Sequence, residues 1–414
     1  MSRVRDFIEV QALPGFPAPP PSSMRLPKFI GCQADASALL RTRRVVLIGC
    51  GSIGARVADS LARLAVKTLW LVDPKIFKPE SLLTHFIDSS EIGQPKASSL
   101  GRRCKCLSPE TGVWVFDGSI QQLRMDAFTD ADLIVLASDN LTCEVEAGQR
   151  ASQMACPLVQ GAVHGESLTV AVRFFANAAG TGPCPYCLFG EAEIEALRNE
   201  VTYSCEQQSG PVALLPGATL PTTSISSLCS LAADLVGLQI LRHVLALGVP
   251  VADTILEHNG YTHRTTITPL RRNPLCPCDH QPWRLLTPPQ PLTQCTAGEL
   301  AAHAGADPDN GGAIAVDGFV WVEASRCQCA DACRVGRFFP AEQSDLGQCP
   351  KCLAPRVLSP FFTHRIVSLR TLGAAIDQTL GHLGAGAACA VLVRNADGRS
   401  SLFRPASPAV PQPL

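Results

Sequence analysis

The chain has 414 residues, of which 46% are hydrophobic and 17% are charged. This length and composition predict two or three folded domains and differ from those of a disordered protein. Lys and Arg (35) nearly balance Asp and Glu (36), so the net charge of −1 gives no general attraction to nucleic acid or to an acidic membrane. The 19 cysteines are unusual, yet residues 1–16 lack the apolar core of a secretory signal. We therefore expect a cytoplasmic protein whose clustered cysteines bind metal or do chemistry, not a disulfide scaffold.

The N-terminal half predicts an α/β fold. Residues 1–28, with the run PGFPAPPPSS, predict a flexible proline-rich tail. From Arg43 onward, apolar runs without polar alternation are separated by helical patterns, which is typical of a doubly wound parallel sheet covered on both faces. The expected strands of this sheet are 43–49, 68–73, 113–116, 132–138 and 157–161.

Further strands are predicted at 165–175 and 263–269, and a long apolar helix within 219–247. Asp234, Arg242 and His243 argue against a membrane span there, so we expect a buried helix or one packed across a homodimer interface.

A proline-rich break at 281–294 marks a boundary in the chain. It predicts a first domain at 29–290, a small α+β domain at 291–403 with its own cysteine cluster, and a second flexible tail at 404–414.

A glycine turn separates the first expected strand from its helix. Gly49, Gly51, Ser52 and Gly54 would let backbone N–H groups approach a nucleotide phosphate at the helix N-terminus. Asp73 ends the next strand, where a carboxylate can accept hydrogen bonds from ribose hydroxyls. These residues indicate a nucleotide site without choosing between a nicotinamide dinucleotide and ATP.

Two charged residues favour Mg·ATP. Lys96 begins a helix in EIGQPKA, where an ammonium can meet polyphosphate, and Asp139 follows a strand at the edge where α/β sheets bind ligands. A carboxylate there can hold Mg²⁺ against phosphate oxygens, whereas without a metal it would repel a pyrophosphate. The alternatives are a solvated Lys96 and an Asp139 that caps the following helix.

The ordered motifs VLIGCGSIG, LVDPKIF, EIGQPKA, LASDN, PLVQGA, CPYCLF and NPLCPC resemble the ThiF/MoeB superfamily of ubiquitin-activating-type adenylyltransferases over about residues 29–280. The resemblance implies a Rossmann-like adenylation domain, often homodimeric, that adenylates the C-terminal carboxylate of a ubiquitin-like or sulfur-carrier protein. It implies ATP, Mg²⁺ and zinc, with Gly51 and Gly54 under the phosphates, Asp73 on ribose, Lys96 on phosphate and Asp139 on Mg²⁺.

One segment departs from the family pattern. Where members usually carry NLNRQ or NLGRH, residues 81–85 read SLLTH, so Thr84 stands in place of an arginine that contacts ATP phosphates. Losing such a cation can slow the reaction by orders of magnitude. Either Arg41, Arg43 or His85 substitutes, or the enzyme is slow, or the chain is a non-catalytic nucleotide-binding scaffold.

A second reaction step would need a thiolate that attacks the acyl-adenylate. Cys205, in TYSCEQQSGP, is the candidate because the resemblance places a mobile loop there; a small cysteine without a role is the alternative. The expected function is a ubiquitin-like activating enzyme that passes its modifier to a conjugating-type enzyme. The residues leave open a sulfur-carrier adenylyltransferase of thiamin or molybdopterin type and an NAD-dependent oxidoreductase.

The cysteine pairs predict two zinc sites. Two thiolate pairs can form the closed tetrahedral site of structural zinc, and the resemblance places a zinc at the first set, where His280 could replace one thiolate. The second set has zinc-ribbon spacing, with Cys333 to spare. The expected ligands are Cys184, Cys187, Cys276 and Cys278 at the first site, and Cys327, Cys329, Cys349 and Cys352 at the second.

Overall fold

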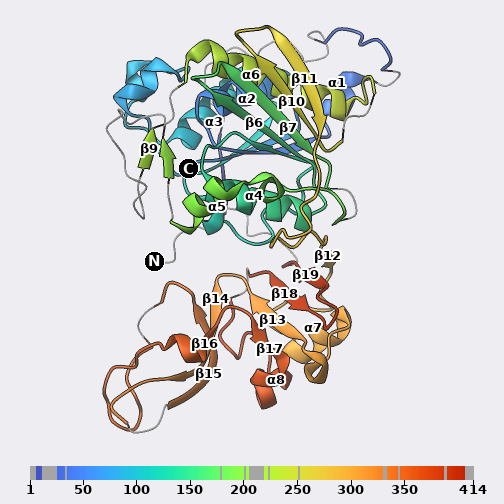
Figure 1. The fold of residues 1–414 in the computed structure, drawn as a ribbon. Helices are drawn as coiled ribbons and strands as arrows, with labels where there is room; N and C mark the ends of the chain where they lie inside the picture. Colours follow the sequence, from blue (N-terminus) through green and yellow to red (C-terminus); the bar gives the residue numbers. More distant parts are fainter. Residues whose placement is uncertain are drawn as a thin grey trace. The chain divides into compact units, whose positions relative to one another are not determined.

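The structure is a computed structural model, and it divides into two compact units. The first consists mainly of residues up to Pro282, and the second of residues from Trp283 onward together with Arg124–Ala127. Figure 1 shows the ribbon of each unit. The residues that the structure describes are 6–11, 26–32, 35–177, 180–199, 202–204, 219–221, 224–249, 252–329, 333–343, 346–386 and 389–405.

The first unit contains a nine-stranded sheet with the order β1-β4-β3-β2-β5-β6-β7-β10-β11. The five strands from β4 to β6 are parallel, and the strands at either end of the order are antiparallel to their neighbours. The strands are β1 Ile8–Glu9, β2 Arg44–Ile48, β3 Thr68–Val72, β4 Gly112–Phe116, β5 Leu133–Leu136, β6 Leu158–His164, β7 Thr169–Phe175, β10 Thr254–Asn259 and β11 Arg264–Pro269.

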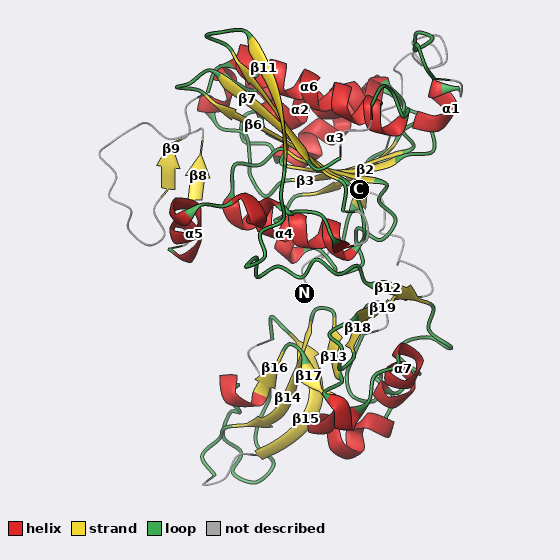
Figure 2. Ribbon diagram, turned by 45° about the vertical axis from the view of Figure 1, so that its right-hand side comes forward, coloured by secondary structure: helices red, strands yellow, loops and turns green. Residues whose placement is uncertain are grey.

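Helices cover both faces of this sheet: α2, α3 and α6 lie on one face, and α4 and α5 on the other (Figure 2). The predicted doubly wound α/β fold is confirmed. Helix α2 buries Val57 and Leu61, four residues apart, as expected for one apolar helix face. The helices are α1 Ala36–Leu40, α2 Ser52–Arg63, α3 Lys96–Leu107, α4 Leu141–Gln153, α5 Glu191–Arg198 and α6 Ser226–Val244.

Helix α6 occupies most of the apolar stretch that could have suggested a membrane span. It buries Leu228, Val236 and Ile240 in the same core cluster as α2. Among the described residues, no helix has the length and apolarity needed to cross a membrane.

The expected N-terminal tail is wrong at its start, because Ile8–Glu9 form a strand of the sheet. Ile8 and Glu9 form β1 against Val115 and Trp114 of β4. The ring of Phe7 is buried and stacks on Trp70 at a centroid distance of 6.0 Å. The apolar residues of FIEV, which precede the prolines, account for this strand.

The second unit is built from two smaller sheets and two short helices, so the predicted α+β class is confirmed. One sheet has the order β12-β19-β18-β13-β17 and the other β15-β14-β16. The elements are β12 Arg284–Leu286, α7 Ala297–Ala304, β13 Ala313–Val316, β14 Phe319–Ser325, β15 Cys333–Pro340, β16 Thr363–His364, β17 Val367–Ser368, α8 Leu369–Leu372, β18 Val391–Arg394 and β19 Ser400–Phe403. Two very short strands, β8 Thr202–Ser204 and β9 Thr219–Pro221, pair apart from these sheets.

Candidate active site and metal centres

The site lies where the strand order reverses direction. From β2 the chain runs outward through β3 to β4 and then returns to β5 on the other side of β2, so a crevice forms between the carboxyl ends of β2 and β5. A pocket of about 680 Å³ opens there, lined among others by Gly49, Gly51, Asp73, Lys96 and Asp139. The expected nucleotide-site residues therefore share one cavity.

The glycine turn after β2 has two positions that no larger residue fits. Gly49 has a positive φ of 92°, and a Cβ on it would lie 2.6 Å from the carbonyl oxygen of Ala137. A Cβ on Gly54 would overlap the carbonyl oxygen of Gly49. The turn is tight because β2 and the segment after β5 approach each other closely.

We expect Gly49→Ala to weaken ATP binding at least tenfold. The new methyl group would have to displace either the turn or Ala137, and alanine is also strained at this positive φ. Titration calorimetry with Mg·ATP measures the effect. The matched control is Gly305→Ala, whose φ of 71° carries similar strain with no atom within 4 Å of the new Cβ. An unchanged ATP affinity in Gly49→Ala would contradict this role for the turn.

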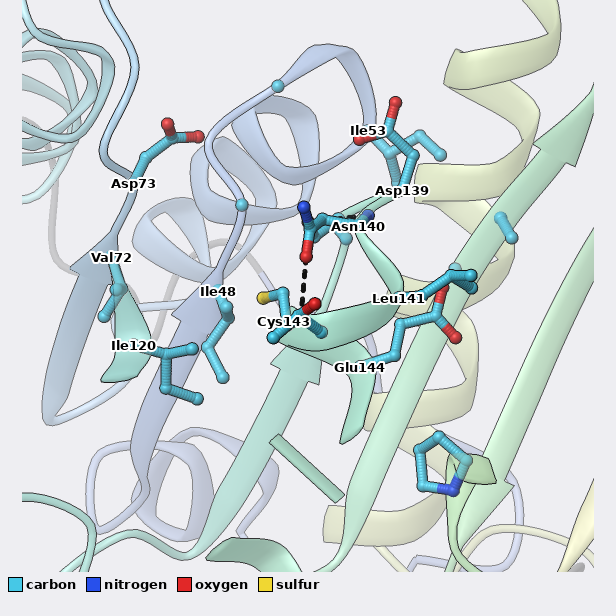
Figure 3. A pocket seen from close by; sticks show the side chains of 18 of the residues that line it. Ile48, Ile53, Val72, Asp73, Ile120, Asp139, Asn140, Leu141, Cys143 and Glu144 are labelled. Atoms are coloured by element: carbon cyan, nitrogen blue, oxygen red, sulfur yellow. Dashed lines mark hydrogen bonds between the residues drawn. The ribbon is translucent and has the colours of Figure 1, made fainter. Parts of the chain in front are cut away.

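Asp73 ties the end of β3 to the glycine turn. Its carboxylate accepts hydrogen bonds from the backbone N–H groups of Cys50, at 2.7 Å, and Lys75, at 2.8 Å. Burial raises the pKa of Asp73, while the charge of Lys96 and these hydrogen bonds act in the opposite direction. In Figure 3, Asp73 and Asp139 lie on opposite sides of the strand that carries Ile48.

Lys96 is the first residue of α3 and is only 4% exposed. Its Nζ lies 3.3 Å from Nε2 of His85 and 5.6 Å from the ring centroid of Phe77. Nδ1 of His85 lies 3.1 Å from the hydroxyl of Thr84. The SLLTH segment thus places an imidazole beside the lysine.

Of the three cations considered as substitutes for the missing arginine, His85 alone lines the pocket. Arg43 lies 3.7 Å from Asp132, which precedes β5, so it lies at the opposite end of the strands from the glycine turn. Arg41 precedes β2 and lies at that same opposite end. The expectation that Arg41 or Arg43 substitutes is therefore wrong, because the sheet separates them from the phosphate side.

Asp139 follows β5 and lines the pocket without being the helix cap. The N-cap of α4 is Asn140, whose side-chain oxygen accepts the backbone N–H of Cys143 at 2.9 Å (Figure 3). The helix is thus capped by Asn140 and not by Asp139. The Asp139 carboxylate faces the cavity.

Sequence reasoning missed four charged residues in the same pocket, Lys75, Glu144, Arg173 and Glu193, of which Glu144 and Arg173 are considered in detail. Burial raises the pKa of Glu144 to about 7, and the neighbouring Gln160 and Arg173 offset part of this effect. Glu144 lies one helical turn after Asn140, and Arg173 is a lone charge in the apolar strand TVAVRFF. Either pattern could have drawn attention to these residues.

The first cysteine cluster has the dimensions of a zinc site. Sγ of Cys184 lies 3.8 Å from Sγ of Cys187 and 3.7 Å from that of Cys276. Sulfur atoms at about 2.3 Å from a tetrahedral zinc lie about 3.8 Å apart. These atoms and a nitrogen of His280 are all within 4.8 Å of one another.

The fourth member of this group is His280, whereas Cys278 lies outside it. Nδ1 of His280 lies 3.0 Å from the carbonyl oxygen of Gly182, to which it can only donate, so Nε2 keeps its lone pair toward Cys187 at 3.7 Å. Such a second hydrogen bond is typical of a metal-binding histidine. Because this bond orients the imidazole, the geometry supports His280 as a ligand, while Cys278 contacts Cys184 from outside the group of four.

The second group consists of Cys327, Cys329, Cys333 and Cys349, again with sulfur atoms within 4.8 Å of one another. Sγ of Cys333 lies 3.2 Å from that of Cys327 and 3.4 Å from that of Cys349. Cys333 pairs with Ser325 at the end of β14, which brings it beside Cys327. Cys333 therefore belongs to the group of four, while the expected ligand Cys352 lies outside this group and contacts Cys329.

The predicted nucleophile, Cys205, lies outside the described residues.

The pocket lies at the strand-order reversal, which is where doubly wound α/β proteins bind their ligands. The model of the ThiF family matches residues 24–278, so the chain belongs to the ThiF family. The family and the enzyme class predicted from the sequence, an adenylyltransferase, are both confirmed.

Named relatives come from several organisms. The chain is 26% identical over 247 residues to a sulfur carrier protein adenylyltransferase of Thermus thermophilus, covering 59% of this chain and 84% of the relative. It is 28% identical over 158 residues to the SAMP-activating enzyme E1 of Haloferax volcanii, covering 37% of this chain and 56% of the relative. Among solved structures, E. coli MccB with ATP is 15% identical with a TM-score of 0.46, covering 59% of this chain and 68% of that one.

Proposed function

We propose that the chain is an ATP-dependent activating enzyme that adenylates the C-terminal carboxylate of a ubiquitin-like or sulfur-carrier protein. The observation that carries this proposal is the convergence of the glycine turn, Asp73, Lys96 and Asp139 on one pocket. The names of the relatives support the substrate class.

The first step needs positioning and charge neutralisation but no protein nucleophile, because a carboxylate is already ionised at neutral pH. A carboxylate oxygen attacks the α-phosphorus of ATP, the bond to the bridging oxygen of the β-phosphate breaks, and pyrophosphate leaves. The N–H groups of the turn at Gly51 and Ser52 and the ammonium of Lys96 offset the phosphate charge, while Asp73 holds the ribose side.

The residues present also fit a magnesium ion. The Asp139 carboxylate faces the cavity at the end of β5, and an oxygen ligand in that place suits Mg²⁺. When bound, the ion would neutralise phosphate charge and orient the leaving group.

Isotope exchange between pyrophosphate and ATP tests the proposal with the full chain and candidate partners, each a small ubiquitin-like or sulfur-carrier protein with an exposed C-terminal glycine. We expect exchange that requires both the partner and Mg²⁺. ATP binding without exchange for every candidate partner would favour a non-catalytic scaffold, a role that the Thr84 substitution motivates.

We further propose that the modifier passes to Cys205 as a thioester. The thiolate would attack the acyl carbon and release AMP, its proton having gone to solvent. We expect Cys205→Ala to keep pyrophosphate exchange within twofold of wild type and to abolish a reductant-sensitive enzyme–modifier adduct on non-reducing gels. Cys106→Ala is the control, and an adduct that persists in Cys205→Ala would contradict the assignment.

The remaining proposals concern assembly and the C-terminal unit. Each cysteine group holds a structural zinc ion, and the C-terminal unit docks the modifier or a conjugating-type enzyme. The enzyme is a cytoplasmic homodimer; sedimentation at micromolar concentration would then give twice the chain mass of 44.0 kDa.

A further inference from the structure

The pocket has a second end, which the nucleotide motifs do not occupy. We call it the acyl end, and it is lined by Glu144, Gly161, Ala162, Val163, Arg173 and Glu193. Its wall is formed by β6 and β7, the first of which lies next to β5 in the sheet. Since neighbouring strands are about 4.8 Å apart, β7 lies about 10 Å from β5 across the sheet.

The charge at this end is mostly negative. Glu144 and Glu193 line the acyl end, and Asp139 lines the same cavity at the end of β5. Among the described lining residues Arg173 is the one cation on the β5–β7 side. The other cationic side chains of the lining, Lys75, His85 and Lys96, lie on the β3 side. Without Arg173, an incoming carboxylate would meet no positive charge at the acyl end.

Arg173 is held in place by its neighbour across the ladder. It lies directly opposite Gln160 in the β6–β7 pairing, and its Nη1 donates to the Gln160 side-chain oxygen at 3.2 Å. Gln160 is 1% exposed, so this support is fixed by the core. Nε of Arg173 is buried and has no hydrogen-bond partner among the described residues. The guanidinium is thus oriented by Gln160, and of its five N–H donors the one on Nε has no partner among the described residues.

Glu144 does not neutralise this cation fully. Its carboxyl group is desolvated, so near neutral pH a substantial fraction is uncharged and leaves Arg173 with positive charge. A guanidinium with a spare donor beside a partly protonated carboxyl group suits a ligand that brings its own carboxylate.

Resting on the proposed function, we propose that Arg173 is the residue that admits and orients the free C-terminal carboxylate of the modifier. Gln160 is its positioning residue, and the acyl end receives the last residues of an extended tail. The enzyme therefore discriminates a free carboxylate from a blocked one before any chemistry occurs.

The test compares two probes in the full chain with Mg²⁺ and a non-hydrolysable ATP analogue. One is a ten-residue peptide that ends in glycine with a free carboxylate, and the other is the same peptide with a C-terminal amide. We expect wild type to bind the acid at least tenfold more tightly than the amide, and Arg173→Gln to remove this preference by weakening the acid alone. Arg173→Lys should restore part of it.

Two controls separate this role from a structural one. Arg264→Gln on the exposed edge strand β11 should keep the preference, and the ATP affinity of Arg173→Gln should stay within twofold of wild type. Equal binding of acid and amide by wild type, failure to bind either, or an unchanged preference in Arg173→Gln would overturn the proposal.

Because these measurements involve no turnover, they are independent of the exchange assay. If a partner supports exchange, the proposed function stands whatever the peptides show. In that case the Michaelis constant for the partner should rise at least tenfold in Arg173→Gln with kcat changed less than threefold.

Discussion

Replacing Lys96 by methionine is expected to lower pyrophosphate exchange at least 100-fold, because the ammonium is the buried cation on the phosphate side of the pocket. Methionine keeps an apolar stem of similar length against Phe77, so the change removes mainly charge. The measurement is the exchange rate at saturating ATP and partner, alongside the melting temperature.

Arg102→Ala is the matched control, since Arg102 is an exposed cation of the same helix α3 and donates a hydrogen bond to the side chain of Gln94. It should leave exchange within twofold of wild type. A Lys96→Met enzyme within tenfold of wild type would show that another cation, such as His85, carries the phosphate charge.

The second large effect is expected at the first zinc group. Elemental analysis of the purified full chain should find two zinc ions per chain, and His280→Ala should lose one of them. Structural zinc contributes directly to folding, so we also expect the melting temperature to fall by at least about 5 °C.

Cys278→Ser is the sharp comparison, because the structure places Cys278 outside the group of four. It should retain both zinc ions and the wild-type melting temperature. Zinc loss in Cys278→Ser together with retention in His280→Ala would restore the four-thiolate set that the sequence suggested.

Zinc loss should also impair the reaction. Leu188 and Phe189 follow Cys187 directly and line the pocket, and Pro185 lies between the two cysteines of the knuckle. A chelated or His280→Ala enzyme is therefore expected to lose exchange in proportion to zinc, which parallel metal and activity measurements would check.

The parallel sheet and the nucleotide end of the pocket were predictable from sequence, because local signals suffice for both. Apolar runs marked β2, β3 and β5, and Asp73 and Asp139 lie at strand ends where topology brings them together. The acyl end was not predictable in this way. Its key pair, Gln160 and Arg173, is defined by a register between two strands, and neither residue belongs to a local motif.

The metal ligands show a second limit of sequence reasoning. Spacing indicated which thiols cluster, but choosing His280 over Cys278 required the hydrogen bond to Gly182, almost 100 residues away in the chain. Likewise, Cys333 joined its cluster because β15 pairs with β14. Burial of Phe7 explains why a proline-rich N-terminus still contains a strand.

The strand β1 also bears on how the protein avoids aggregation through the edges of its sheet. It closes one edge of the nine-stranded sheet with only two residues, too short a template for another chain to extend. The other edge, β11, has six exposed residues with Arg264 at its start and Pro269 at its end. A charge and a proline at those positions oppose edge-to-edge pairing. One edge of the sheet is therefore protected because β1 is short, and the other because β11 carries Arg264 and Pro269.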